Sequence, residues 1–304
     1  MFDRSALPAY DCTVLGSGLI PATYRRGMTQ TTIDSPSWRD SEPATFDLSG
    51  IPRTAYIPLL SVLYAIGVSL FVAVEPTKPW ILLVVVALIG LGTDGIMRSH
   101  PRASLQRWSD TAPFLFVPVL FTLASGLFLE EVVGGYRTAP AVIVAAGLLS
   151  AGLYGEYVTT ISHGPSYALG RLLLNILTYL SAFAFFAVVY EFDVGLLPAS
   201  FAVGLFSMLL AVEVFREAEA DAFRALAFAA AIGVVLAEMR WALYFIPFDG
   251  FLAATLLLLI FYQTTGLVQH HLTRDLDRSV AAEFTAVTVV GLAIVVLGRV
   301  LGID

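Results

Sequence analysis

Long apolar runs separated by short polar breaks make up the chain from Ala55 onward. A helix rises ~1.5 Å per residue, so about 20 apolar residues suffice to cross the hydrocarbon core of a bilayer. The breaks carry turn residues, among them Glu75-Pro76 and Gly164-Pro165. The pattern predicts an all-α, polytopic transmembrane helical bundle of nine spans, over residues 55–74, 79–97, 111–130, 139–162, 166–190, 197–215, 223–246, 251–269 and 281–300.

Residues 1–54 do not follow this pattern, because they mix Gly, Ser, Thr, Pro and Asp with short apolar stretches. They also lack the basic segment and the apolar run of about 7–15 residues that form a signal peptide. We therefore divide the chain into a polar, partly disordered tail over 1–54 and a transmembrane helical domain over 55–304. Met28 begins an alternative start, MTQTTIDSPSWRD, which would remove the first 27 residues, whereas a genuine flexible tail is the other interpretation.

Composition supports membrane insertion and excludes several classes of function. The mean hydropathy is +0.81, and 58% of residues are hydrophobic against 13% charged, which is too apolar for an ordinary soluble domain. A single cysteine, Cys12, excludes an intrachain disulfide and any multi-cysteine metal site. The chain has one lysine, Lys78, and scattered arginines, so we predict no nucleic-acid partner and expect membrane lipids as its surroundings.

The distribution of basic residues predicts the orientation, because loops on the cytoplasmic side retain Lys and Arg. An N-terminus in the cytoplasm places on that side Arg39, Arg53, Arg98, Arg102, Arg107, Arg171, Arg216, Arg224, Arg274 and Arg278. The other side then receives Lys78, Arg137 and Arg299. We therefore predict a cytoplasmic N-terminus, and an odd number of spans places the C-terminus outside.

Polar side chains inside the predicted helices are the candidate site. An ionised group at the centre of a membrane helix costs about 2.5–3.5 kcal/mol, so each should face protein or water. Counted along the helices, five of these groups lie some 5–10 Å to the cytoplasmic side of the midplane. Those five are Asp94, Glu156, Arg171, Glu213 and Gln263, and Asn175 and Glu238 complete the set. The set is either an ion or substrate path or a structural clamp.

The fourth and fifth spans offer the clearest pair. Glu156 lies eight residues before Gly164 and Arg171 lies seven residues after it, so an antiparallel hairpin brings both to one depth. We predict an ion pair between them. Each residue also begins a polar stripe at helical spacing, with Thr160 and His163 on one helix and Asn175 and Thr178 on the next. A clamp and a substrate or ion site remain open as interpretations.

Glu238 and Arg240 in the seventh span are two positions apart and therefore point in different directions on a helix. We expect Arg240 to extend outward beside Trp241 toward the headgroups. Glu238 lies closer to the centre and must find a donor on another helix or take up a proton.

Motifs of membrane enzymes are missing from the sequence. Retinal binding requires a lysine in a core helix, and Lys78 is in a loop. The four histidines have none of the spacings of metal ligands. We predict no catalytic residue, no metal and no cofactor.

One segment carries a resemblance. The stretch Glu238-Met239-Arg240-Trp241, followed by Pro247, Tyr262, Gly266 and His270, resembles the C-terminal half of a family of bacterial multi-pass membrane proteins of unknown function. The resemblance implies a multi-pass architecture and a location in the bacterial cytoplasmic (inner) membrane. It implies no catalytic residue.

Three functions remain as hypotheses. The first is a proton-linked or small-molecule transporter in which Asp94, Glu156, Arg171 and Glu213 line a wet cavity with an excess of acids. The second is a non-catalytic membrane scaffold or assembly partner, with a second copy of the chain or another membrane protein as its partner. The third is an enzyme that modifies lipid or isoprenoid. A wet cavity at Glu156 and Glu238 favours the first, a dry bundle with paired charges the second, and a polar groove open to lipid the third.

Overall fold

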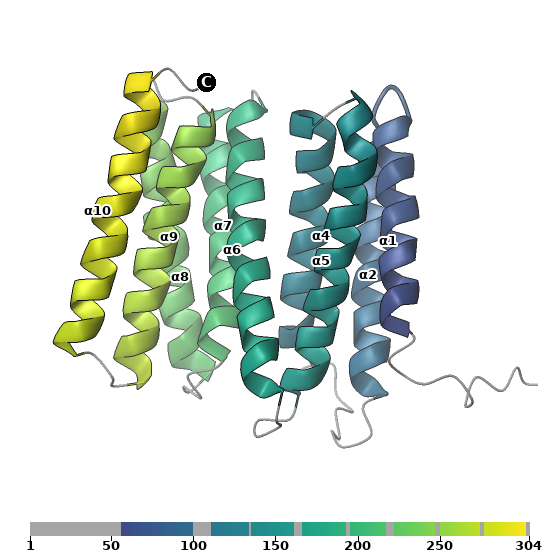
Figure 1. Cartoon of the computed structure of the whole chain (residues 1–304), viewed down its shortest axis with the longest axis horizontal. Coiled ribbons are helices and arrows are strands. Elements are labelled where there is room, and N and C mark those ends of the chain that lie inside the picture. The colour runs from purple at the N-terminus through teal and green to yellow at the C-terminus, as the bar shows by residue number, and fades with distance from the viewer. Residues whose placement is uncertain are drawn as a thin grey trace, which may run out of the picture. The chain divides into compact units, whose positions relative to one another are not determined.

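The computed structural model describes residues 56–99, 111–133, 135–160, 166–192, 195–216, 222–246, 250–273 and 277–301. Within these ranges nine helices are long and apolar enough to cross a membrane, and they stand side by side as a bundle (Figure 1). The expected polar tail over 1–54, with the alternative start at Met28, lies outside the described residues.

The helices begin and end within a few residues of the predicted positions. In chain order they are α1 (Tyr56–Ala73), α2 (Pro79–Arg98), η4 (Ala112–Leu115), α4 (Phe116–Phe128), η5 (Leu129–Val133), η6 (Gly135–Arg137), α5 (Thr138–Thr159), α6 (Tyr167–Glu191), α7 (Leu196–Phe215), α8 (Ala222–Tyr244), α9 (Gly250–Thr273) and α10 (Arg278–Leu301). The short elements η4 and η5 extend α4 into one apolar run over Ala112–Val133. We call the end of the bundle that holds Tyr56 the inner end, after the predicted orientation, and the opposite end the outer end.

Local sequence explains several helix ends. α2 begins at Pro79, a position where the missing N–H of proline costs nothing, because the first turn of a helix has no acceptor for it. α6 ends after Glu191, where Phe192 adopts an extended conformation. α7 starts directly after Gly195 and has Pro198 in its first turn. Proline and glycine therefore mark the ends that the sequence predicts.

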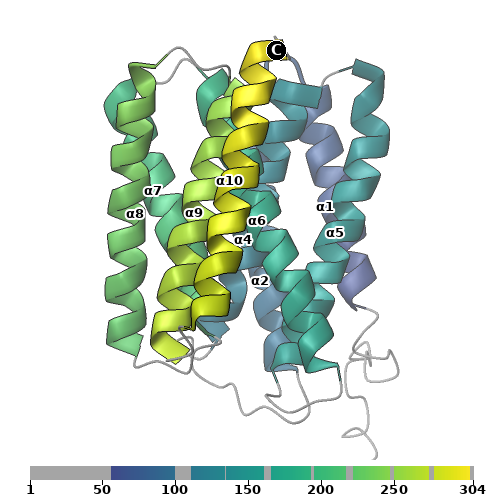
Figure 2. The ribbon, with the colours of Figure 1, turned by 60° about the vertical axis from the view of Figure 1, so that its left-hand side comes forward.

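α6 is the central helix and packs against α4, α5, α7 and α9. One apolar cluster fills the space among α4, α6, α7, α8 and α9, and a second fills the space among α1, α2, α4, α5 and α6. α10 packs against α9 at the edge of the bundle in Figure 1 and comes to the front in Figure 2. Most of the apolar side chains on α10 are therefore exposed, as expected of a helix surrounded by lipid.

Glycines allow two pairs of helices to approach closely. A Cβ atom at Gly155 of α5 would lie 3.0 Å from the carbonyl oxygen of Gly170 on α6. A Cβ atom at Gly204 of α7 would lie 2.8 Å from the carbonyl oxygen of Gly233 on α8. Small residues at such crossings are typical of membrane helices, which gain stability from close backbone packing.

Candidate functional site

Four charged side chains meet at the inner ends of α5, α6 and α7. Nη1 of Arg171 on α6 lies 3.1 Å from Oε1 of Glu213 on α7. Nη2 of Arg216, directly after α7, lies 2.9 Å from Oε2 of Glu156 on α5 and 2.9 Å from Oε1 of Glu213. We call Glu156, Arg171, Glu213 and Arg216 the inner charge network.

The positions of these residues in their helices bring them to one level. Glu156 precedes the last residue of α5 by three positions, and Arg171 follows the first residue of α6 by four. Glu213 and Arg216 are three positions apart and therefore lie on one face of α7. The close approach of Gly155 to Gly170 lies next to both Glu156 and Arg171.

The network is almost completely buried. The Glu156 and Glu213 side chains are 0% and 2% exposed, and the Arg171 and Arg216 side chains are 6% and 19% exposed. Two acids and two bases leave no net charge, which compensates the cost of removing each ion from water. Burial alone would lower the pKa of Arg216, but the carboxylates of Glu156 and Glu213 outweigh burial and raise it. Arg216 therefore stays charged.

An aromatic ring covers the network from the side of η4. The guanidinium carbon of Arg216 lies 4.4 Å from the ring centroid of Phe114, within the range of a cation–π contact. The ring shields the most exposed member of the network from water.

The predicted ion pair between Glu156 and Arg171 is wrong in its partners. Arg171 bonds to Glu213, and Glu156 bonds to Arg216, so the two hairpin residues belong to one network without the direct bond that we predicted. The distance of each residue from the hairpin turn determines its depth but not the direction of its side chain around the helix axis. Glu213 on α7 and Arg216 directly after it lie at the same depth, and they are the partners of Arg171 and Glu156.

The predicted polar layer also divides into separate local contacts. Asp94 on α2 bonds through Oδ2 to Nε of Arg98, 2.7 Å away on the same helix. Gln263 on α9 donates from Nε2 to the carbonyl oxygen of Phe284 on α10, at 3.0 Å. Asn175 lies half-buried one turn from Arg171 on α6. The four described members of the inner charge network are two acids and two bases, so the predicted excess of acids does not appear among them.

The burial of Glu238 and Arg240 is the reverse of the prediction, in which Arg240 extends outward and Glu238 lies inside. Glu238 is exposed in a groove between α7 and α8, whereas Arg240 is 4% exposed and points into the bundle. Arg240 shares a helix face with Leu236 and Leu243, four residues before it and three after it, and both are buried. The burial of Arg240 and the exposure of Glu238 follow from the face of α8 on which each residue lies, and not from its distance to the end of the helix.

Arg216 and Arg240 are largely buried charged residues whose burial the sequence does not predict. The bias of basic residues places Arg216 on the cytoplasmic side, but its spacing from Glu213 is that of a pair on one helix face. The sequence predicts that Arg240 extends outward, but the buried positions Leu236 and Leu243 flank it at helical spacing.

Several hydroxyl groups inside the helices donate to carbonyl oxygens of their own helices. Thr93 donates to the carbonyl oxygen of Ile89 at 2.8 Å, Thr122 to that of Pro118 at 2.7 Å, and Ser181 to that of Leu177 at 2.6 Å. Such bonds satisfy a hydroxyl without water. These positions therefore do not mark a wet path.

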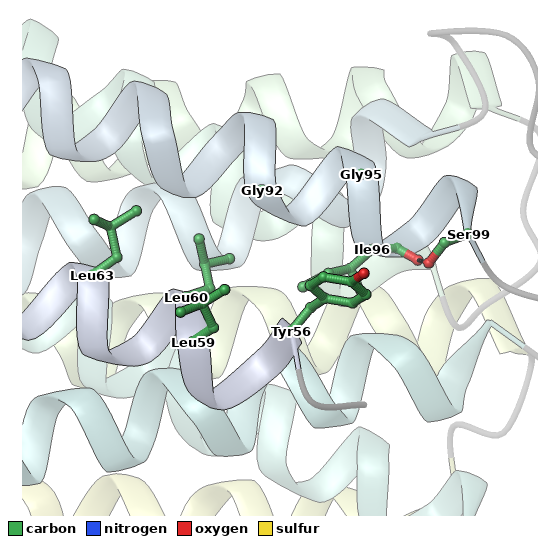
Figure 3. Close-up of a pocket in the computed structure, with 8 residues that line it drawn as sticks. All are labelled: Tyr56, Leu59, Leu60, Leu63, Gly92, Gly95, Ile96 and Ser99. Carbon is green, nitrogen blue, oxygen red and sulfur yellow. Dashed lines mark hydrogen bonds between the residues drawn. The ribbon is translucent and has the colours of Figure 1, made fainter. Parts of the chain in front are cut away.

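Grooves between the described helices are lined mainly by apolar side chains. One groove, of about 410 Å³, lies between the inner halves of α1 and α2, where Gly92 and Gly95 provide no side chain (Figure 3). Leu59, Leu60 and Leu63 line it, with Tyr56 near one end. Ser99 at that end donates to the carbonyl oxygen of Ile96 at 2.8 Å. The lining of this groove is therefore mainly apolar.

A family profile described as "Protein of unknown function (DUF5656)" matches residues 62–298, from α1 to the last turns of α10. The chain belongs to this family. The match includes the segment from Glu238 to His270 that resembles a family of unknown function, so that part of the expectation is confirmed. Every member of the inner charge network lies within the matched range. No curated protein and no solved structure matches the chain.

Proposed function

We propose that this protein is a non-catalytic multi-pass membrane scaffold or assembly partner, in which the inner charge network clamps α5, α6 and α7 together. One observation carries the proposal: every member of the network is ion-paired, and the two carboxylates are at most 2% exposed. Paired charges in a dry, balanced cluster specify which helices pack together and in which register. The partner that fits this role is a second copy of the chain or another membrane protein.

The proposal includes insertion in the bacterial cytoplasmic (inner) membrane, with the N-terminus in the cytoplasm and the C-terminus outside. The nine apolar helices of the described residues and the bias of arginines toward one end support this orientation. We expect alkaline phosphatase fused after Asp304 to be active, because that enzyme folds outside the cytoplasm. A fluorescent protein fused before Met1 should be bright inside the cell. Termini that report from one compartment contradict the proposed orientation.

A test of the clamp asks whether water reaches the network. Leu210 is fully buried one turn above Glu213 on α7, so it faces the same side one step deeper in the bundle. In a background with Cys12→Ser, we expect the cysteine of Leu210→Cys to resist a charged, membrane-impermeant methanethiosulfonate reagent added from either side. A clamp keeps this position dry through long incubation.

The matched control is Tyr136→Cys, because Tyr136 is 86% exposed at the outer end. It should react with the same reagent from outside. Labelling of Leu210→Cys at a rate comparable to this control overturns the clamp, because it shows that water passes the network.

A proton-linked transporter is the second candidate, and two atoms favour it. Oε1 of Glu156 and Nη1 of Arg216 are buried and have no hydrogen-bond partner among the described residues. In a transporter these atoms belong to an inner gate, and separating Arg216 from Glu156 and Glu213 opens it. Slow labelling of Leu210→Cys that is accelerated by Arg216→Gln without a fall in Tm supports this candidate over the clamp.

A further inference from the structure

Arg240 is a buried cation without a carboxylate partner among the described residues. Its residue exposure is 4%, and two of its donor atoms, Nε and Nη1, have no hydrogen-bond partner there. The position is four residues before the end of α8, about 6 Å below the outer end at ~1.5 Å per residue. A buried guanidinium normally has an anionic partner, because its desolvation is otherwise uncompensated.

Aromatic rings hold the guanidinium in place but do not neutralise it. The Arg240 guanidinium carbon lies 4.1 Å from the ring centroid of Tyr190, on α6, and 5.9 Å from that of Tyr244. Stacking on an aromatic face leaves the edge of the guanidinium, with its N–H donors, available to an acceptor. The hydroxyl of Tyr190 is also buried beside the Arg240 guanidinium, and its proton has no acceptor among the described residues.

The N-terminus of α9 lies against the same tyrosine. A Cβ atom at Gly250, the first residue of α9, would lie 3.4 Å from Cβ of Tyr190 and 3.6 Å from Oε2 of Glu191. The first N–H groups of a helix have no acceptor within the helix, and its dipole favours an anion there. Glu191 is exposed and provides the one negative charge that the described residues show at this end of α9.

We propose that Arg240, Tyr190 and the N-terminus of α9 form a site for a phosphate-bearing anion at the outer end of the bundle. The planar fork of an arginine matches two phosphate oxygens, and the tyrosine hydroxyl supplies a further donor. The phosphate belongs to the headgroup of an anionic lipid or to an anion in solution. The site does not depend on the inner charge network.

The test uses the full chain, purified in a nonionic detergent without added phospholipid. Phosphatidylglycerol and inorganic phosphate are added separately, and Tm and bound lipid, measured by native mass spectrometry, are followed as the concentration rises. We expect a saturable rise in Tm with at least one probe. A response to phosphatidylglycerol alone assigns the lipid headgroup, and a response to inorganic phosphate as well assigns an anion from solution. A wild-type chain that responds to neither probe overturns the site.

Two variants test whether binding of the phosphate probes depends on Arg240. Arg240→Gln should weaken the apparent affinity about tenfold or more, because hydrogen bonds to charged groups contribute enough for such a change. Arg137→Gln is the matched control, since Arg137 is an exposed arginine near the same end and should leave the affinity unchanged. Equal losses in the two variants contradict the proposal. If Arg240→Gln fails to fold, Arg240→Lys replaces it, because it keeps the charge but loses the fork.

A second pair of variants tests whether the chain itself supplies the anion. Asp193 and Asp249 belong to the adjoining connections, outside the described residues. Asp193→Asn and Asp249→Asn should leave phosphate binding unchanged. If either variant raises the apparent affinity tenfold, that carboxylate occupies Arg240 in the wild type, and the proposed site is overturned.

Discussion

Arg171→Leu is expected to be among the most destabilising substitutions in the chain. Its loss removes one cation from a buried cluster in which Nη2 of Arg216 contacts both Glu156 and Glu213. Removing one partner from a buried ionic cluster typically costs about 3–5 kcal/mol, because a charge remains without compensation. We expect a large loss of monodisperse protein after extraction in detergent, together with a clearly lower Tm of the remaining fraction.

Rescue by a second substitution identifies the partner. Adding Glu213→Leu to Arg171→Leu restores the balance and leaves the bond between Arg216 and Glu156 intact, so most of the lost yield and Tm should return. The matched control adds Glu238→Leu, which removes a glutamate that is exposed between α7 and α8 and should rescue nothing. If Glu238→Leu restores yield and Tm as well as Glu213→Leu does, the proposed network is contradicted. The loss in Arg171→Leu would then follow from the total charge of the chain and not from the contact with Glu213.

The helices could be predicted from the sequence because lipid imposes a strong local rule. Each crossing segment must satisfy its own backbone hydrogen bonds, so length and apolar content suffice to locate it. The structure accordingly has α2 over Pro79–Arg98 where the sequence predicts 79–97, and α7 over Leu196–Phe215 where it predicts 197–215. Packing between helices follows no such local rule, and the central position of α6 could not be inferred.

The sequence predicts how deep each residue of the candidate site lies along its helix, but not the direction in which its side chain points around the helix axis. Counting residues placed Glu156, Arg171 and Glu213 at one level, and the structure brings these three together. The same count grouped Asp94 and Gln263 with them, although their nearest partners are Arg98 and Phe284. The rotation of each helix about its axis separates the two sets, and it depends on contacts such as that between Gly204 and Gly233.

That contact leads to the second large expected effect, in Gly233→Ala. The added Cβ would lie 2.6 Å from the carbonyl oxygen of Gly204 and 3.0 Å from Cβ of Met208. Ordinary contact begins at 3.4 Å, and a backbone oxygen cannot rotate away as a side chain can, so α7 and α8 must separate along their length. Overpacking of this kind costs about 1–3 kcal/mol or more. We expect a lower Tm in detergent and weaker disulfide cross-linking between cysteines placed on α7 and α8.

Gly147→Ala on α5 is the matched control, because a Cβ there meets no atom within 4 Å. The same change in helix propensity favours alanine at both positions by about 1 kcal/mol, so propensity alone would stabilise both variants. A fall in Tm for Gly233→Ala but not for Gly147→Ala therefore isolates the crossing of α7 and α8. Gly233 also lies seven residues, or two turns, before Arg240 on one helix face, so separation of α8 should weaken phosphate binding in the same variant. Equal Tm values for the two variants would contradict the close approach of these helices.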